Sequence, residues 1–218
     1  TVNGSDFNVI QFNQSQVSSR TYELQDNMQF NESMTIGNGA TLSLNGKNLT
    51  VGNNDPDNST IPYVPPGETL TVETGGHLFV NAGSSLQFDH RDGNPKLDVY
   101  GTFSLVGNSG LNANITRSTG YDTRGTEITI YPGATVNAEY YNILYLAPEG
   151  FVVQNGATID ANQNFSNGIW SNIYTGNQYT DPVDRTTVID TFIYLNIDVD
   201  VMANSIQNLT FNHGGTPT

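Results

Sequence analysis

With 218 residues, of which 36% are hydrophobic, the chain is long enough to bury one elongated core or two small ones. Only seven residues are Lys or Arg and the net charge is −14, which argues against nucleic acid and anionic membranes as partners, because both require cationic patches. The absence of cysteine excludes a disulfide framework, Cys-ligated zinc and a thiol nucleophile.

The composition is rich in Asn, Gly, Thr and Ser, and no segment keeps a helical period, so we expect an all-β protein. A first strand is expected at residues 7–12, Phe-Asn-Val-Ile-Gln-Phe. A recurring unit follows, in which two short strands with apolar residues at i and i+2 are joined by a glycine corner. Its first copy runs from Met34 through Gly39 to Leu44, and Met34 and Leu42 are eight residues apart.

The stretch from Gly52 to Gly67 (GNNDPDNSTIPYVPPG) interrupts the repeat. Its Pro, Gly, Asn and Asp content predicts a loop of about residues 52–67 that leaves the repeat and returns to it. We therefore expect a single elongated domain over residues 1–218. A linker between two domains is the alternative.

After the loop the unit is repeated at the same spacing, and further copies begin at Ile128 and Phe151. The apolar pairs directly after the loop are Leu70/Val72, Leu78/Val80 and Leu86/Phe88, with Gly75 and Gly83 between them. Glycine can adopt φ > 0, and a following Ala or Ser with Thr or Ser lets the next strand begin at once. Ordinary hairpins also turn at glycine, but they seldom repeat the same corner residues at one period.

This pattern predicts a parallel β-solenoid or β-arch stack with a shared core. The residues expected to point into that core are Ile36, Leu42, Leu44, Leu70, Val72, Leu78, Val80, Leu86, Phe88, Ile128, Ile130, Val136, Val153 and Ile159.

The second half of the chain alternates short apolar pairs with Asn-rich turns, in residues 167–173, 187–190 and 205–212. Together with Ile128–Val136, these segments resemble coils of the right-handed parallel β-helix proteins, the pectin-lyase-like group. The resemblance implies coils whose asparagines can stack in ladders. That group has several functions, so function must come from a site.

Pectin-lyase-like hydrolases use paired carboxylates near a His, and the lyases use a basic residue beside calcium-binding acids. The chain has no adjacent Asp-Asp pair. Arg124 and Arg185 are the best lyase candidates among scattered basic residues. His77, His90 and His213 lie in predicted corners or loops, where we expect solvated turn histidines. We therefore expect no enzyme activity.

Calcium binds six to eight oxygen ligands, which Asp- and Asn-rich loops can supply. Asp55 and Asp57 are the candidate calcium ligands, although a solvated loop is the competing interpretation. The loop from Asp89 to Asn94 and the pair Asp198/Asp200 are further acidic places, and the pair is expected to mark the wet side of a strand. No other cofactor is expected.

Tyrosines and one tryptophan cluster in the second half and suggest either a sugar-stacking platform or packing and subunit contact. We favour packing or subunit contact. The aromatic residues concerned are Tyr140, Tyr141, Tyr145, Trp170, Tyr174 and Tyr179.

Asn-x-Ser/Thr sequons recur along the chain and favour an exported, extracellular protein. We expect glycans on Asn58 and Asn164, which lie in loop-like sequence. No stretch is long and apolar enough for a direct membrane span. Thr1 does not begin a signal peptide, so the signal of an exported protein would already have been removed.

Three function classes remain: a structural protein of a coat, a β-helix carbohydrate-active enzyme, and an adhesin or receptor-binding segment. We favour the first, a self-assembling sheath, surface layer or filament at the cell surface. Archaeal sheath and surface-layer proteins of methanogens are similar in low charge, in Asn, Thr and Gly content and in their lack of cysteine.

The ends of a solenoid expose unpaired strand edges, which monomeric proteins usually cover. The first and last strand-like segments, residues 7–12 and 209–212, are uncharged and β-favouring. We therefore expect a homo-oligomer or polymer, with subunit contacts at Val9, Phe12, Leu209 and Phe211.

Overall fold

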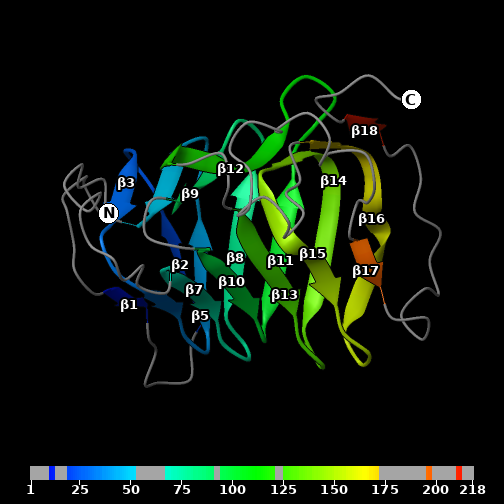
Figure 1. Ribbon diagram of the computed structural model, residues 1–218. Helices are drawn as coiled ribbons and strands as arrows, with labels where there is room; N and C mark the ends of the chain where they lie inside the picture. The colour runs from blue at the N-terminus through cyan, green and yellow to red at the C-terminus, as the bar shows by residue number, and fades with distance from the viewer. Residues whose placement is uncertain are drawn as a thin grey trace.

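The computed structural model describes residues 10–12, 19–52, 67–90, 94–120, 125–171, 195–197 and 210–212. Within these ranges every regular element is a β-strand, which confirms the predicted all-β class. The strands lie side by side in long parallel sheets, in chain order from the blue end to the yellow end of Figure 1. The architecture is a parallel β-solenoid.

One sheet, called row one here, contains seven strands, and every pairing in it is parallel. In spatial order the strands are β1 (Ile10–Phe12), β4 (Met34–Ile36), β7 (Thr69–Val72), β10 (Lys96–Val99), β13 (Thr126–Ile130), β15 (Leu146–Val153) and β17 (Leu195–Ile197).

The second sheet is formed by two further rows that long strands join. Row two contains β2 (Arg20–Glu23), β5 (Ala40–Ser43), β8 (His77–Asn81) and β11 (Thr102–Val106); row three contains β3 (Met28–Phe30), β6 (Asn48–Val51), β9 (Ser85–His90), β12 (Ala113–Gly120) and β18 (Thr210–Asn212). The long strands β14 (Thr135–Leu144) and β16 (Thr158–Ser171) run through both rows. As far as β11, three successive strands therefore make one coil, and each strand pairs with the third strand after it. From β12 on, each strand pairs with the second strand after it, because β14 and β16 each take part in two rows.

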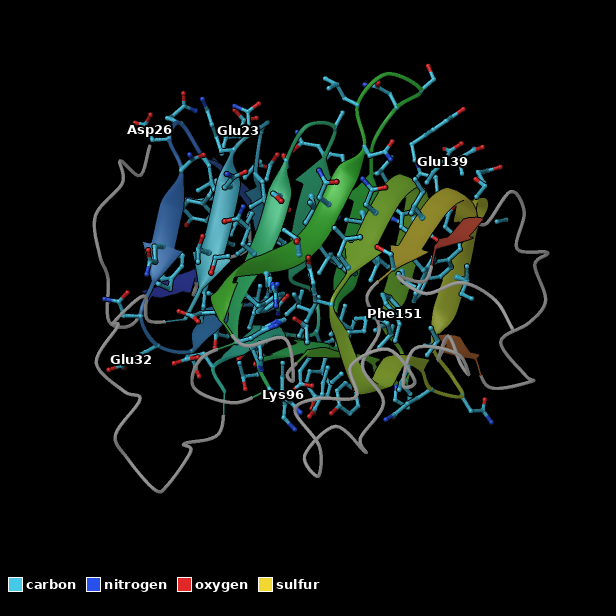
Figure 2. The ribbon with its side chains drawn as sticks, turned by 45° about the horizontal axis from the view of Figure 1, so that its top comes forward. Glu23, Asp26, Glu32, Lys96, Glu139 and Phe151 are labelled. Carbon is cyan, nitrogen blue, oxygen red and sulfur yellow. The ribbon has the colours of Figure 1, made fainter. Side chains whose placement is uncertain are left out.

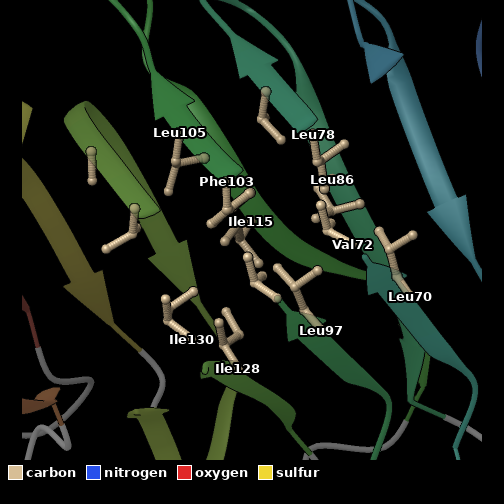
Figure 3. Packing of buried hydrophobic residues seen from close by; sticks show 14 of the residues in the cluster. Leu70, Val72, Leu78, Leu86, Leu97, Phe103, Leu105, Ile115, Ile128 and Ile130 are labelled. Atoms are coloured by element: carbon tan, nitrogen blue, oxygen red, sulfur yellow. The ribbon is translucent and has the colours of Figure 1, made fainter. Parts of the chain in front are cut away.

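The eight-residue repeat is the length of one strand with its corner. Leu70, Leu78 and Leu86 occupy β7, β8 and β9, one in each row of a single coil. In the next coil their paired residues are Leu97, Phe103 and Ile115, and all six side chains are buried. Figure 3 shows these side chains meeting in the space that the rows enclose.

The predicted corners are present, and their glycines adopt the left-handed conformation that an L-residue avoids. The φ angles are 76° at Gly39, 78° at Gly75, 74° at Gly83, 84° at Gly133 and 89° at Gly156. Where β14 and β16 pass from row two to row three, the bend is instead made by non-glycine residues. Tyr140 has a φ of 48° and Phe165 one of 63°.

All of the core positions predicted from the repeat are buried. At the C-terminal end of the described core the aliphatic residues give way to an aromatic cluster of Tyr141, Phe151, Phe165 and Trp170. The loop predicted at about residues 52–67 lies outside the described residues except at its two ends, Gly52 and Gly67.

Replacing Leu78 by Ala should lower the free energy of unfolding by about 2–5 kcal/mol, because the side chain is fully buried and its removal leaves a cavity. Urea unfolding followed by far-UV circular dichroism would measure this. Thr102→Ala, on the outward face of the neighbouring strand, is the control and should change stability by no more than about 0.5 kcal/mol. Equal losses in the two variants would contradict the assigned core.

Candidate functional site

The edge of β2 is the candidate site, because its outer backbone groups have no partner strand among the described residues. The one strand in the described ranges that pairs with β2 is β5, and Arg20, Thr21 and Glu23 are exposed. The Arg20 and Leu24 N–H groups donate to Gly39 O and Ser43 O at 2.9 and 3.0 Å. In a parallel strand, successive residues direct their backbone groups to opposite sides. The N–H and C=O groups of Thr21 and Glu23 therefore face away from β5.

The side chains at this edge are polar or half-buried. Tyr22 pairs with Leu42 and packs partly buried against the end of the core. Glu23 and Asp26 are exposed at the same end of the molecule, where Figure 2 labels them. The edge thus combines peptide groups that face away from β5, one aromatic ring and two carboxylates.

The predicted subunit contacts fall on or beside the terminal strands. Phe12 lies in β1 and pairs with Ile36, and Phe211 lies in β18 and pairs with Trp170. Val9 and Leu209 are outside the described residues. The strand β2 was not predicted, because its residues Arg20–Glu23 carry no glycine corner.

The outward face of row two carries a column of threonines. Thr21, Thr41, Thr102, Thr135 and Thr158 occupy equivalent positions in the register, and His77 takes the remaining position between Thr41 and Thr102. Adjacent strands in a sheet are about 4.8 Å apart, so the column is regularly spaced along the solenoid. Only the register of the folded sheet brings these residues together, since they are far apart in sequence.

His77 is not the solvated turn residue predicted from the sequence. It begins strand β8, is half-buried, and its Nε2 lies 2.9 Å from Ser104 Oγ. Asn137 Nδ2 donates to the same oxygen at 2.8 Å. Burial lowers the pKa of His77 below its ordinary value of 6.5, because the imidazolium form loses hydration there.

His90 also contradicts that prediction, because it is fully buried with its Nε2 3.0 Å from Thr126 Oγ1. The sequence Asp89-His90-Arg91 looked like a loop, but the first two residues end strand β9. Asp89 is also buried, so it belongs to the packed end of strand β9 and not to a solvent-exposed loop. His213 lies outside the described residues.

Among the described residues, no three His, Asp or Glu side chains come together in an arrangement that could hold a metal ion. The proposed calcium ligands Asp55 and Asp57, the pair Asp198/Asp200 and the two arginines Arg124 and Arg185 fall outside those residues. Their roles stay predictions.

Two of the clustered aromatic residues, Tyr141 and Trp170, pack into the core, whereas Tyr140 and Tyr145 are half-buried. Trp170 Nε1 donates to Tyr141 Oη at 2.9 Å, and both side chains are fully buried. Burial also raises the pKa of Tyr141. The Arg117 guanidinium lies over the Tyr145 ring, with Cζ 4.2 Å from the centroid. Tyr174 and Tyr179 are outside the described residues.

A second aromatic pair, not predicted from the sequence, occupies the corner after row one. The Tyr100 and Tyr131 rings stack with centroids 4.2 Å apart and an interplanar angle of 10°. Burial and the neighbouring Tyr100 hydroxyl raise the pKa of Tyr131 to about 12. Tyr100 retains 40% exposure, so this pair is accessible from solvent.

Asparagine amides link neighbouring coils in row three, as the β-helix resemblance implies. Asn112 Nδ2 donates to Asn142 Oδ1 at 2.9 Å, and Asn142 Nδ2 donates to Asn114 Oδ1 at 2.7 Å. Asn114 also donates to Ser84 O. These residues therefore stabilise the stacking of coils.

Comparison with protein-family models, with curated proteins and with solved structures found no match. In the described part of the chain, no helix is long and apolar enough to cross a membrane. Function must therefore be inferred from the geometry of this molecule.

The lowered pKa of His77 predicts acid sensitivity. Below about pH 6.5 the unfolded chain binds a proton at this residue before the folded chain does, so the free energy of unfolding falls as the pH is lowered. His77→Gln should reduce that dependence, measured by urea unfolding between pH 4.5 and 7.5. Thr102→Gln, in the same column, is the control and should keep the wild-type dependence; an unchanged slope in His77→Gln would refute the prediction.

Proposed function

We propose that the protein is a structural subunit of an extracellular, self-assembling coat, such as a sheath, a surface layer or a filament. The observation that carries this proposal is the β2 edge, where the peptide groups of Thr21 and Glu23 face away from the only strand that pairs with β2 among the described residues. Such an edge is a template for another strand.

The regular stacking supports the same function. All pairings between named strands are parallel, and equivalent residues stay in register from β4 through β7 to β10 and from β5 through β8 to β11. The register shifts within three pairings nearer the C-terminal end, β9/β12, β13/β15 and β14/β16. A stack of this kind can be extended by another molecule without a change in local geometry. Charged residues make up 13% of the chain, so the charges are sparse on the surface. The electrostatic repulsion between two copies in contact is therefore small at any one place.

Assembly should depend on the terminal strands. We expect the purified protein to form regular polymers at high concentration. Negative-stain electron microscopy should show these polymers, and they should sediment faster than the monomer. The experiment is done with and without calcium, because Asp55 and Asp57 are candidate calcium ligands. The variant Val9→Lys/Phe211→Lys should form fewer and shorter polymers, because each terminal segment gains a charge.

The matched control is Ser109→Lys/Leu111→Lys, which adds the same charge at an exposed corner away from both ends. It should assemble as the wild type does. An intact chain that stays monomeric at high concentration, with and without calcium, would refute the proposed function.

Glycosylation is the second expectation for an extracellular subunit. Glycopeptide mass spectrometry of protein from its native source should find glycan on Asn58 or Asn164. Asn114 also lies in a sequon, but its amide is held by Ser84 O and Asn142, so it should be unmodified. An intact mass equal to that of the bare polypeptide would remove this expectation.

A further inference from the structure

We infer that Tyr100 and Tyr131 form a modification site, at which a peroxidase using hydrogen peroxide joins the two rings as a dityrosine cross-link within one chain. The rings stack with their centroids 4.2 Å apart and an interplanar angle of 10°. Tyr100 is 40% exposed, so an oxidising enzyme can draw an electron from the pair at the surface. The cross-link lies inside one molecule, so it goes beyond the proposed assembly and does not depend on it.

The backbone register of row one holds the two rings together. Val99 and Ile130, the residues directly before the two tyrosines, are paired between β10 and β13. The ladder continues into the corner, because Tyr100 N–H donates to Val72 O at 2.7 Å. In the next coil, Tyr131 N–H donates to Val99 O at 2.8 Å. The two tyrosines are therefore neighbours on adjacent coils, with their backbones about 4.8 Å apart.

The stacked arrangement suits coupling of the two rings. Phenoxyl radicals on two separate molecules must meet before they combine, whereas these two rings are already in contact. Bringing two reacting groups together in advance removes the entropic cost of that encounter. Oxidation of this pair should therefore give an internal cross-link in preference to a link between two chains.

Asp98 is placed to take the proton that oxidation of Tyr131 releases. Tyr131 Oη donates to Asp98 Oδ1 at 3.4 Å, and Asp98 is half-buried on β10. A phenol loses an electron more readily when a base accepts its hydroxyl proton in the same step, because the radical cation that otherwise forms is a strong acid. Tyr100 is exposed and can release its proton to water.

Cross-linking removes one hydrogen atom from each phenol. The peroxidase takes one electron from each ring, while the proton of Tyr131 passes to the Asp98 carboxylate and that of Tyr100 to water. Each phenoxyl radical carries spin on the Cε carbons beside its oxygen, and a C–C bond forms between one Cε atom of each ring. The hydrogen on each of these carbons then moves as a proton to the phenolic oxygen, which restores both aromatic rings. The two electrons and two protons reduce one hydrogen peroxide to two waters.

Two other tyrosines of the described core are placed differently. Tyr141 is fully buried, and the Phe165 and Trp170 rings meet it edge to face, at interplanar angles of 85° and 82°. Tyr145 has the guanidinium of Arg117 over its ring. Neither tyrosine is in the parallel contact with a second phenol that Tyr100 and Tyr131 share.

The new bond would tie neighbouring coils together at the corner after row one. It would close a covalent loop that contains β11 (Thr102–Val106), β12 (Ala113–Gly120) and β13 (Thr126–Ile130). A cross-link of this kind restricts the unfolded chain. The cross-linked protein should therefore unfold at a higher urea concentration than the same protein before oxidation.

Peptide mapping tests the cross-link, because two proteases isolate each tyrosine on its own peptide. Trypsin, which cleaves after Lys and Arg, releases residues 97–117, in which Tyr100 is the only tyrosine. A protease that cleaves after Glu releases residues 128–139, in which Tyr131 is the only tyrosine. After the dilute folded protein is treated with hydrogen peroxide and a peroxidase, the two peptides should be joined. Their mass should be two hydrogen atoms below the sum of the separate peptides, and they should show dityrosine fluorescence.

Three variants separate the parts of the inference. Tyr100→Phe keeps an aromatic ring but has no phenol to oxidise, so it should abolish the joined peptide. Tyr140→Phe removes a half-buried tyrosine outside the pair, and as the matched control it should cross-link as the wild type does. Asp98→Asn should slow the cross-linking several-fold, because the amide cannot take the proton. A rate equal to that of the wild type would reject the role of Asp98.

An equal mixture of unlabelled and isotope-labelled protein distinguishes an internal cross-link from one between chains. Joined peptides that are wholly light or wholly heavy would support the inference. Mixed peptides, or oxidation that joins other tyrosines and leaves residues 97–117 and 128–139 separate, would overturn it. Neither result changes the proposed function, because the polymers are tested without oxidant.

Discussion

The parallel hydrogen-bond register between coils is the constraint on which the rest of the structure depends. It places Leu70 beside Leu97 and Leu78 beside Phe103, and so it builds the core by stacking like positions. The same register aligns the outward threonines of row two and brings the amides of Asn112, Asn114 and Asn142 within hydrogen-bond distance. A slip of one residue would turn every apolar side chain outward, so the buried rows hold the register firmly.

Local patterns in the sequence were sufficient to predict the class of fold and much of the core. The units at Met34, Leu70, Ile128 and Phe151 carry both of the required signals, an apolar i, i+2 pair and a glycine corner. The coil of β10, β11 and β12 was missed, although Leu97, Phe103 and Ile115 are buried. Its corners contain Tyr100-Gly101 and Gly107-Asn108 in place of the Gly-Ala or Gly-Ser motif, so the local signal is weaker.

Features made by contacts between coils could not be predicted in the same way. His90 bonds Thr126, and His77 bonds Ser104, across 36 and 27 positions of sequence. Neither spacing follows from a local motif, because the loops between coils vary in length. The edge of β2 is a similar case: which peptide groups face outward depends on the side that β5 occupies.

Three rows of strands have a mechanical consequence for any fibre in which these solenoids lie along the fibre axis. The strands run across that axis, so the hydrogen bonds between coils point along it. Between any two neighbouring coils, a pulling force along the axis would therefore be shared by the hydrogen bonds of all three rows. Before neighbouring coils can separate, these bonds must break together or peel away from one corner. Extension should therefore proceed in discrete steps of one coil, with each step releasing the chain length stored in that coil.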